Sequence, residues 1–96
     1  MNSEESQPSA EQTELMEFPC DFPLKVFGLN QAGFEEVVLD LLRVHCSVET
    51  EFVVSRNESK KGKYQSLTIT FTADSRQQLD AIYQSLTDCE QVVMSL

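Results

Sequence analysis

The segment YQSLTITFT, at residues 64–72, alternates with a period of two between side chains that prefer the interior and side chains that prefer water. Leu67, Ile69 and Phe71 fall on one side of such a strand, while serine, threonine and tyrosine side chains fall on the other. This pattern is typical of an antiparallel sheet with one buried face and one polar face. The segment therefore predicts a sheet that other elements cover on one side only.

Three further segments predict strands. In FPLKVFGL, Leu24 and Val26 share one face and Lys25, Phe27 and Leu29 share the other, which predicts a strand over 23–29. TEFVVSR (50–56) is rich in β-branched and aromatic residues. QVVMSL (91–96) predicts a last strand with Val92, Met94 and Leu96 on one face.

Two segments predict helices because their apolar residues recur at helical spacing. The first spans 31–46, with Asn30 as its N-cap. Its apolar stripe is Phe34, Val37, Val38, Leu41, Leu42 and His45. Asp74 or Ser75 caps the second, and Ser75 with Gln78 fits a capping box. Its apolar stripe is Leu79, Ile82, Tyr83 and Leu86.

The predicted order is β-α-β-β-α-β. Each helix has one apolar stripe and the sheet has one apolar face. All three surfaces are buried when both helices pack on the same face of the sheet. Right-handed crossovers then give a ferredoxin-like α+β plait, a four-stranded antiparallel sheet with the first and third strands at its centre.

Charge and composition limit the class of protein. Of 96 residues, the first 21 hold six acids and no base, and the net charge is −9. Residues 1–14 are too polar to bury a core, so we predict a disordered acidic tail followed by one domain at 15–96. An acidic surface disfavours binding to nucleic acid or anionic membrane. Three scattered cysteines, no signal peptide and no apolar stretch of membrane-spanning length predict a cytoplasmic protein.

No motif in the sequence defines a reaction. The lone histidine, His45, precedes Cys46, but adjacent helical residues point about 100° apart and do not face each other. The chain has only three glycines and no phosphate-binding or dinucleotide-binding fingerprint. We predict that it is not an enzyme and that it has no metal site and no cofactor.

RNA recognition is a weak third hypothesis, since the same plait serves RNA-recognition modules. Their third strand begins with Lys or Arg and Gly and then requires aromatic residues at three places. Lys61 and Gly62 match the start of this motif, but the three positions that require aromatic residues hold Lys63, Gln65 and Thr68. Phe27 would be a lone stacking platform.

The segment NESKKGKYQS (57–66) gathers three of the seven basic residues, Lys60, Lys61 and Lys63. It is short, polar and contains Gly62, which predicts a hairpin loop with Gly62 at positive φ. Lysines at a hairpin tip often serve only to keep an edge soluble. The alternative is recognition of an acidic partner or an anionic metabolite.

EFPCDFPLKVFG (17–28), SKKGKYQSLTITF (59–71) and VVMSL (92–96) resemble the YbeD-like family of small bacterial proteins, the UPF0250 type. The resemblance covers about residues 14–96. It implies a plait similar to the ACT-type regulatory domains that bind amino acids, and it carries no catalytic or ligand-binding residues. The matching positions are Pro19, Lys25, Gly28, Ser59, Gly62, Tyr64 and Ser66.

These observations favour a regulatory or adaptor module that acts by protein association through the open sheet face. The candidate interaction surface is Lys25, Phe27, Lys60, Lys61, Lys63, Tyr64, Ser66 and Thr68. The alternative is an ACT-like sensor of a small anionic metabolite, such as an amino acid, at the interface of a homodimer. Its candidate ligand turn is Gly28, Asn30, Gln31 and Gly33.

Overall fold

The computed structural model describes residues 17–96, so the predicted tail and the predicted domain start at residue 15 lie outside the described residues. The elements follow the predicted order. They are β1 (Cys20–Leu29), α2 (Phe34–Val44), β2 (Val53–Glu58), β3 (Tyr64–Ala73), α3 (Arg76–Thr87) and β4 (Val92–Ser95).

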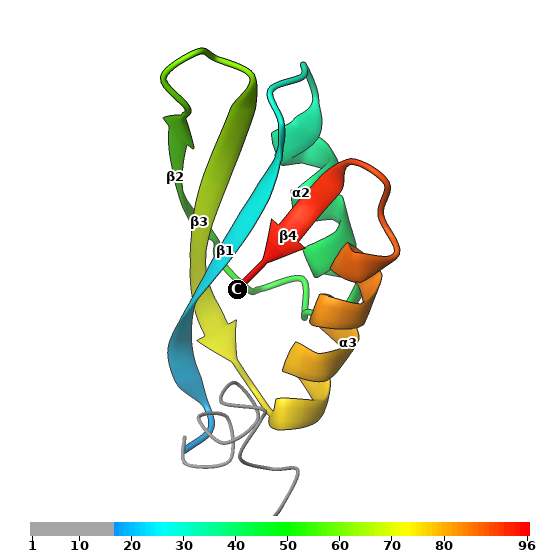
Figure 1. Ribbon diagram of the computed structural model, residues 1–96. Coiled ribbons are helices and arrows are strands. Elements are labelled where there is room, and N and C mark those ends of the chain that lie inside the picture. Colours follow the sequence, from blue (N-terminus) through cyan, green and yellow to red (C-terminus); the bar gives the residue numbers. More distant parts are fainter. Residues whose placement is uncertain (1–16) are drawn as a thin grey trace, which may run out of the picture.

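The strands form one four-stranded sheet in the order β2-β3-β1-β4, and every neighbouring pair is antiparallel. Both helices lie on the same side of this sheet (Figure 1). The prediction of a ferredoxin-like α+β plait, with the first and third strands central, is therefore confirmed.

The core lies between the sheet and the helices, where the predicted faces meet. Its members are almost fully shielded from solvent: Leu24, Val26, Phe34, Val38, Leu39, Leu42, Leu67, Ile69, Phe71, Ala73, Leu79, Ile82 and Leu86. Burying each large apolar side chain stabilises the fold by about 1.5–3 kcal/mol. Because one face of the sheet supplies all of its core residues, the other face plays no part in this packing.

The first helix is shorter than predicted, and its predicted cap is wrong. It begins at Phe34, after Gly33 with φ of 86°, and no side chain caps it. The Asn30 side chain instead donates from Nδ2 to the Gly62 carbonyl oxygen at 2.9 Å. The second helix starts as predicted, since Ser75 Oγ accepts from the Gln78 amide at 3.1 Å.

Two strand boundaries also differ from the prediction. β1 starts at Cys20, so Pro23 lies inside a central strand and pairs with Thr70. The ladder tolerates the proline because β4 hydrogen-bonds to β1 only around Lys25 to Gly28, so that no strand of residues 17–96 pairs with the edge beside Pro23. β2 is displaced to Val53–Glu58 because Phe52 leaves the ladder and packs against the Phe71 ring, with centroids 5.8 Å apart.

The prediction that Val92, Met94 and Leu96 share one face is wrong. The register between β1 and β4 shifts at Phe27 and Gly28, so that Phe27 pairs with Met94 while Gly28 pairs with Val92. Val93 is the extra residue of this bulge, and an extra residue moves the following side chains to the other face. Val92 consequently packs against the core, whereas Met94 lies on the opposite face.

Candidate functional site

The face of the sheet opposite the helices, here called the open face, collects the predicted interaction residues of β1 and β3. Lys25 pairs with Thr68 and Phe27 pairs with Ser66, and paired residues project from the same face. Tyr64 lies one pair further along, opposite Leu29. The structure therefore brings together five residues that the sequence analysis selected by alternation.

The bulge in β4 adds apolar side chains to the open face. Met94 pairs with Phe27, and Leu96 exchanges both backbone hydrogen bonds with Lys25, so both residues project from this side. We call Phe27, Leu29, Tyr64, Met94 and Leu96 the apolar patch. Tyr64, Met94 and Leu96 are 42%, 48% and 59% exposed, which is high for large apolar side chains that adjoin one another.

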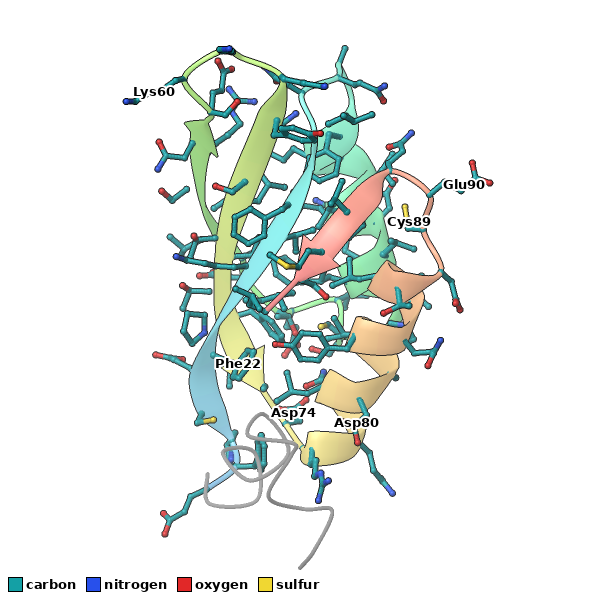
Figure 2. The ribbon with its side chains drawn as sticks, in the orientation of Figure 1. Phe22, Lys60, Asp74, Asp80, Cys89 and Glu90 are labelled. Atoms are coloured by element: carbon teal, nitrogen blue, oxygen red, sulfur yellow. The ribbon has the colours of Figure 1, made fainter. Side chains whose placement is uncertain are left out.

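The lysine hairpin, residues 59–63, stands at the end of the open face next to Tyr64. Gly62 has φ of 70° as predicted, and its amide donates to the Ser59 carbonyl oxygen at 2.9 Å. Asn30 holds the loop from outside, because its backbone amide donates to the Lys63 carbonyl oxygen and its side-chain Nδ2 donates to the Gly62 carbonyl oxygen, both at 2.9 Å. The backbone is thus held in place while Lys60 projects outward at the tip (Figure 2).

Lys63 links the hairpin to the apolar patch. Its Nζ lies 5.6 Å from the centroid of the Tyr64 ring, which is within the range of a cation–π contact. The aromatic ring and the positive charge therefore form one continuous surface.

The predicted ligand turn between β1 and α2 uses most of its polar groups within the fold. Gly28 is buried under Phe34, Asn30 anchors the lysine hairpin, and Gln31 accepts hydrogen bonds from the Phe34 amide and the Gln65 side chain. These interactions give structural reasons for the polar and glycine residues that the sequence analysis assigned to a ligand.

A hollow of about 400 Å³ remains beside this turn, lined in part by Glu35, Glu36, Arg56 and Gln65. Arg56 Nη1 lies 3.7 Å from Glu35 Oε1. Two carboxylates beside one arginine leave the hollow without a net positive charge. An anionic ligand would have to displace the existing ion pair to reach the guanidinium.

His45 and Cys46 connect the two helices. His45 Nε2 hydrogen-bonds to Ser85 Oγ at 2.7 Å, and Gln78 Nε2 donates to the His45 carbonyl oxygen at 2.9 Å. Within the described residues no carboxylate is hydrogen-bonded to His45, so the serine–histidine pair lacks the third group that orients a catalytic base.

Burial raises the pKa of the Cys46 thiol, and the nearby Asp74 carboxylate raises it further. A raised pKa disfavours the thiolate, which is the reactive form of cysteine. Across residues 17–96, no three His, Cys, Asp or Glu side chains are grouped so that they would hold a metal ion.

Three contributors to this region were missed by the sequence analysis. Met94 and Leu96 reach the open face only through the bulge, for which the sequence carries no local signal. Gln65 falls on the buried face, is 4% exposed, and donates from Nε2 to the Leu29 carbonyl oxygen at 3.3 Å. Gln65 alternates in step with Leu67, Ile69 and Phe71, and a single amide in such an apolar series is the sequence signal that its side chain is buried and hydrogen-bonded.

A ferredoxin-like plait in which residues 17–96 leave one sheet face uncovered, with a lysine hairpin at its rim, places the chain among small single-sheet α+β domains. Residues 13–96 match the family described as "Protein of unknown function (DUF493)", and the chain belongs to that family. It is 47% identical to a UPF0250 protein of Chromobacterium violaceum, over 92% of this chain and 99% of the relative. It is 42% identical to UPF0250 protein NE1487 of Nitrosomonas europaea, over 85% and 94% of the two chains. The resemblance found in the sequence is therefore confirmed.

The solution structure of protein HP0495 from H. pylori is similar in fold. The two chains are 19% identical, each is covered over 94% of its length, and the TM-score is 0.69. Neither helix among the described residues has the length and hydropathy needed to cross a bilayer.

Proposed function

We propose that the chain is a non-enzymatic regulatory or adaptor module that associates with another protein through its open face. The apolar patch is the observation that carries this proposal. Contiguous apolar side chains that remain in water commonly mark a protein interaction site. Both helices of the described residues pack on the opposite face, so nothing in residues 17–96 covers the patch.

The edges of the sheet support association through the face instead of through strand pairing. β2 carries the charged residues Arg56 and Glu58 along its edge, and β4 is four residues long with a bulge at Val93. Charges, bulges and short edge strands all discourage the addition of a foreign strand.

Site-specific photocrosslinking in bacterial cells tests this proposal. The photoreactive amino acid p-benzoylphenylalanine replaces Tyr64 on the open face, or Gln77, an exposed residue of α3, as the matched control. We expect adducts of discrete mass from position 64 and none from position 77. Met94 is the second position tested on the open face. Identical adducts from positions 64 and 77, or no adducts from either position 64 or position 94, would contradict the proposal.

The second candidate is a sensor of a small anionic metabolite, such as an amino acid, at a dimer interface. The hollow beside the β1–α2 turn, with Arg56 in its wall, supports it, although Glu35 and Glu36 weaken the attraction for an anion. A ligand at a hundredfold excess over its Kd stabilises a protein by about 2.7 kcal/mol. Unfolding temperatures that do not change with any amino acid would remove this candidate for those compounds.

RNA binding remains the third candidate. The prediction that Phe27 is a lone aromatic platform is wrong, because Tyr64 projects from the same face of the neighbouring central strand. Two rings on central strands favour base stacking. The net charge of −9 opposes the approach of a polyanion.

A further inference from the structure

The positive charges of the chain fall into two groups. Each arginine forms an ion pair with a carboxylate on a helix: Arg43 with Asp40 at 2.9 Å, Arg56 with Glu35 at 3.7 Å and Arg76 with Asp80 at 3.9 Å. Within residues 17–96 no ion pair involves a lysine. All four lysines lie on the open face or at its rim, namely Lys25, Lys60, Lys61 and Lys63.

Most carboxylates of residues 17–96 lie elsewhere, the nearest exception being Glu58, which lines a hollow with Phe27 and Tyr64 beside the hairpin. Figure 2 shows Asp74 and Asp80 at the end of the domain opposite Lys60. Glu36 and Asp40 are exposed on α2. A protein with net charge −9 therefore has a positive region that adjoins its apolar patch.

The apolar patch has the dimensions of one helix. From Lys25 to Leu29 along β1 is about 13 Å, and from β4 across β1 to β3 is about 10 Å. An α-helix is about 10–12 Å wide with its side chains and rises about 5.4 Å per turn, so two to three turns cover the patch. This contact is small beside the roughly 800 Å² per partner of a standard interface, and we expect micromolar affinity.

We propose that the open face binds an acidic amphipathic helix of another protein. Its apolar stripe packs on Phe27, Leu29, Tyr64, Met94 and Leu96, and its carboxylates meet Lys25 and the lysine hairpin. The inference rests on the proposed function and names the chemistry of the partner. Helices already pack on the other face of this sheet, which shows that its twist accommodates them.

A second copy of the chain is a poorer occupant. A twofold dimer that stacked the two open faces would bring lysines of both copies to the same interface, where like charges repel. An acidic partner removes this repulsion and supplies carboxylates to lysines that form no ion pair within residues 17–96.

Peptide titration followed by amide NMR tests the inference on the labelled full chain. Two peptides of about 14 residues, about 21 Å long as helices, share one leucine and phenylalanine stripe and carry either glutamate or lysine elsewhere. A third peptide has the glutamate sequence with a central proline. We expect the glutamate peptide to shift the amide signals of β1, β3, β4 and the hairpin. The lysine peptide and the proline peptide are expected to bind at least about tenfold more weakly.

A pair of charge reversals supplies the matched control. Lys60→Glu with Lys61→Glu is expected to weaken the glutamate peptide about tenfold at physiological salt. Arg43→Glu with Arg76→Glu changes the net charge equally, at residues of the helix layer, and is expected to leave the affinity within about twofold. Unchanged amide dispersion in both variants verifies that each remains folded.

Several outcomes would overturn the inference. They are equal binding of the glutamate and lysine peptides, shifts on α2 and α3 instead of the sheet, and self-association that perturbs the open face. Binding of single-stranded oligouridine at this face with steep salt dependence would assign it to RNA. If no peptide binds, the acidic helix is ruled out as the partner, but the proposed function stands. If positions 64 and 94 also give no photocrosslinked adducts, the proposed function is ruled out as well.

Discussion

Replacing Gly28 by alanine adds a methyl group to β1 where Phe34 of the first helix and Gln91, the residue before β4, pack against it. A Cβ at this position would lie 2.5 Å from the Gln91 carbonyl oxygen and 2.5 Å from Cζ of Phe34. A flexible side chain would move aside from such a contact, but one obstacle is backbone and the other is a ring packed in the core. The surrounding structure must therefore shift.

Overpacking a well-packed site costs about 1–3 kcal/mol, and the backbone obstacle places Gly28→Ala at the upper end, at about 3 kcal/mol. Total stabilities are about 0.05–0.15 kcal/mol per residue, so this is a large fraction for a small domain. The corresponding fall in Tm is about 12–24 °C.

Urea and thermal unfolding, followed by far-UV circular dichroism, measure the effect. Gly33→Ala is the control, because Gly33 has φ of 86° but no atom within 4 Å of its missing Cβ. It is expected to lose only the conformational cost of about 1–2 kcal/mol. In a double-mutant cycle, Phe34→Leu should offset part of the Gly28→Ala loss. A loss below about 1 kcal/mol for Gly28→Ala would refute the packing argument and reopen a ligand role for this glycine.

Alkaline pH should destabilise the fold, because burial raises the pKa of both Cys46 and Tyr83. The thiol and the phenol ionise at lower pH in the unfolded chain than in the folded chain. Their contribution to the free energy of unfolding is therefore complete below about pH 8.5, the ordinary pKa of a thiol, and declines as pH rises. Urea unfolding at pH 7 and pH 10 measures the decline, and Cys46→Ser should reduce it. Gln78→Ala removes a hydrogen bond to the His45 carbonyl oxygen at 2.9 Å and one to the Asp74 amide at 2.7 Å. We expect it to cost about 1–2 kcal/mol in the same assay, and an effect below about 0.5 kcal/mol would contradict this role. Asn30→Ala removes the side-chain hydrogen bond to the Gly62 carbonyl oxygen and keeps the backbone bond to Lys63. It should accelerate hydrogen exchange of the hairpin amides with little change in global stability; unchanged exchange would show that the Asn30 side chain does not hold the loop.

Periodicity alone was enough to predict the fold. The alternation in residues 64–72 and the helical stripes depend on which side chains avoid water, and burial decides the same question in the folded chain. The order of elements then leaves few arrangements that cover one sheet face with two helices. Element ends were less predictable: Asn30 is a residue type that commonly caps helices, yet its side chain forms a long-range bond to Gly62 instead.

Part of the candidate site was likewise predictable from alternation, and part was not. Lys25, Phe27, Tyr64, Ser66 and Thr68 were assigned to one face by alternation within their strands, and the observed register agrees. Whether they form a functional site stays a prediction.

The sequence by itself determined which side chains are apolar, which are charged, and which period each segment follows. The tertiary structure decided where the segments meet. The bulge at Val93 places Met94 beside Phe27, because a one-residue shift in register reverses the faces of a strand. Ion pairs with helix carboxylates occupy the arginines, while no ion pair within the described residues reaches the lysines. The pairs of Arg43 and Arg76 lie within a single helix, at spacings of three and four residues that a helical pattern already allows. The bulge and the pair between Arg56 and Glu35 depend instead on contacts between residues far apart in the chain, which no local pattern encodes.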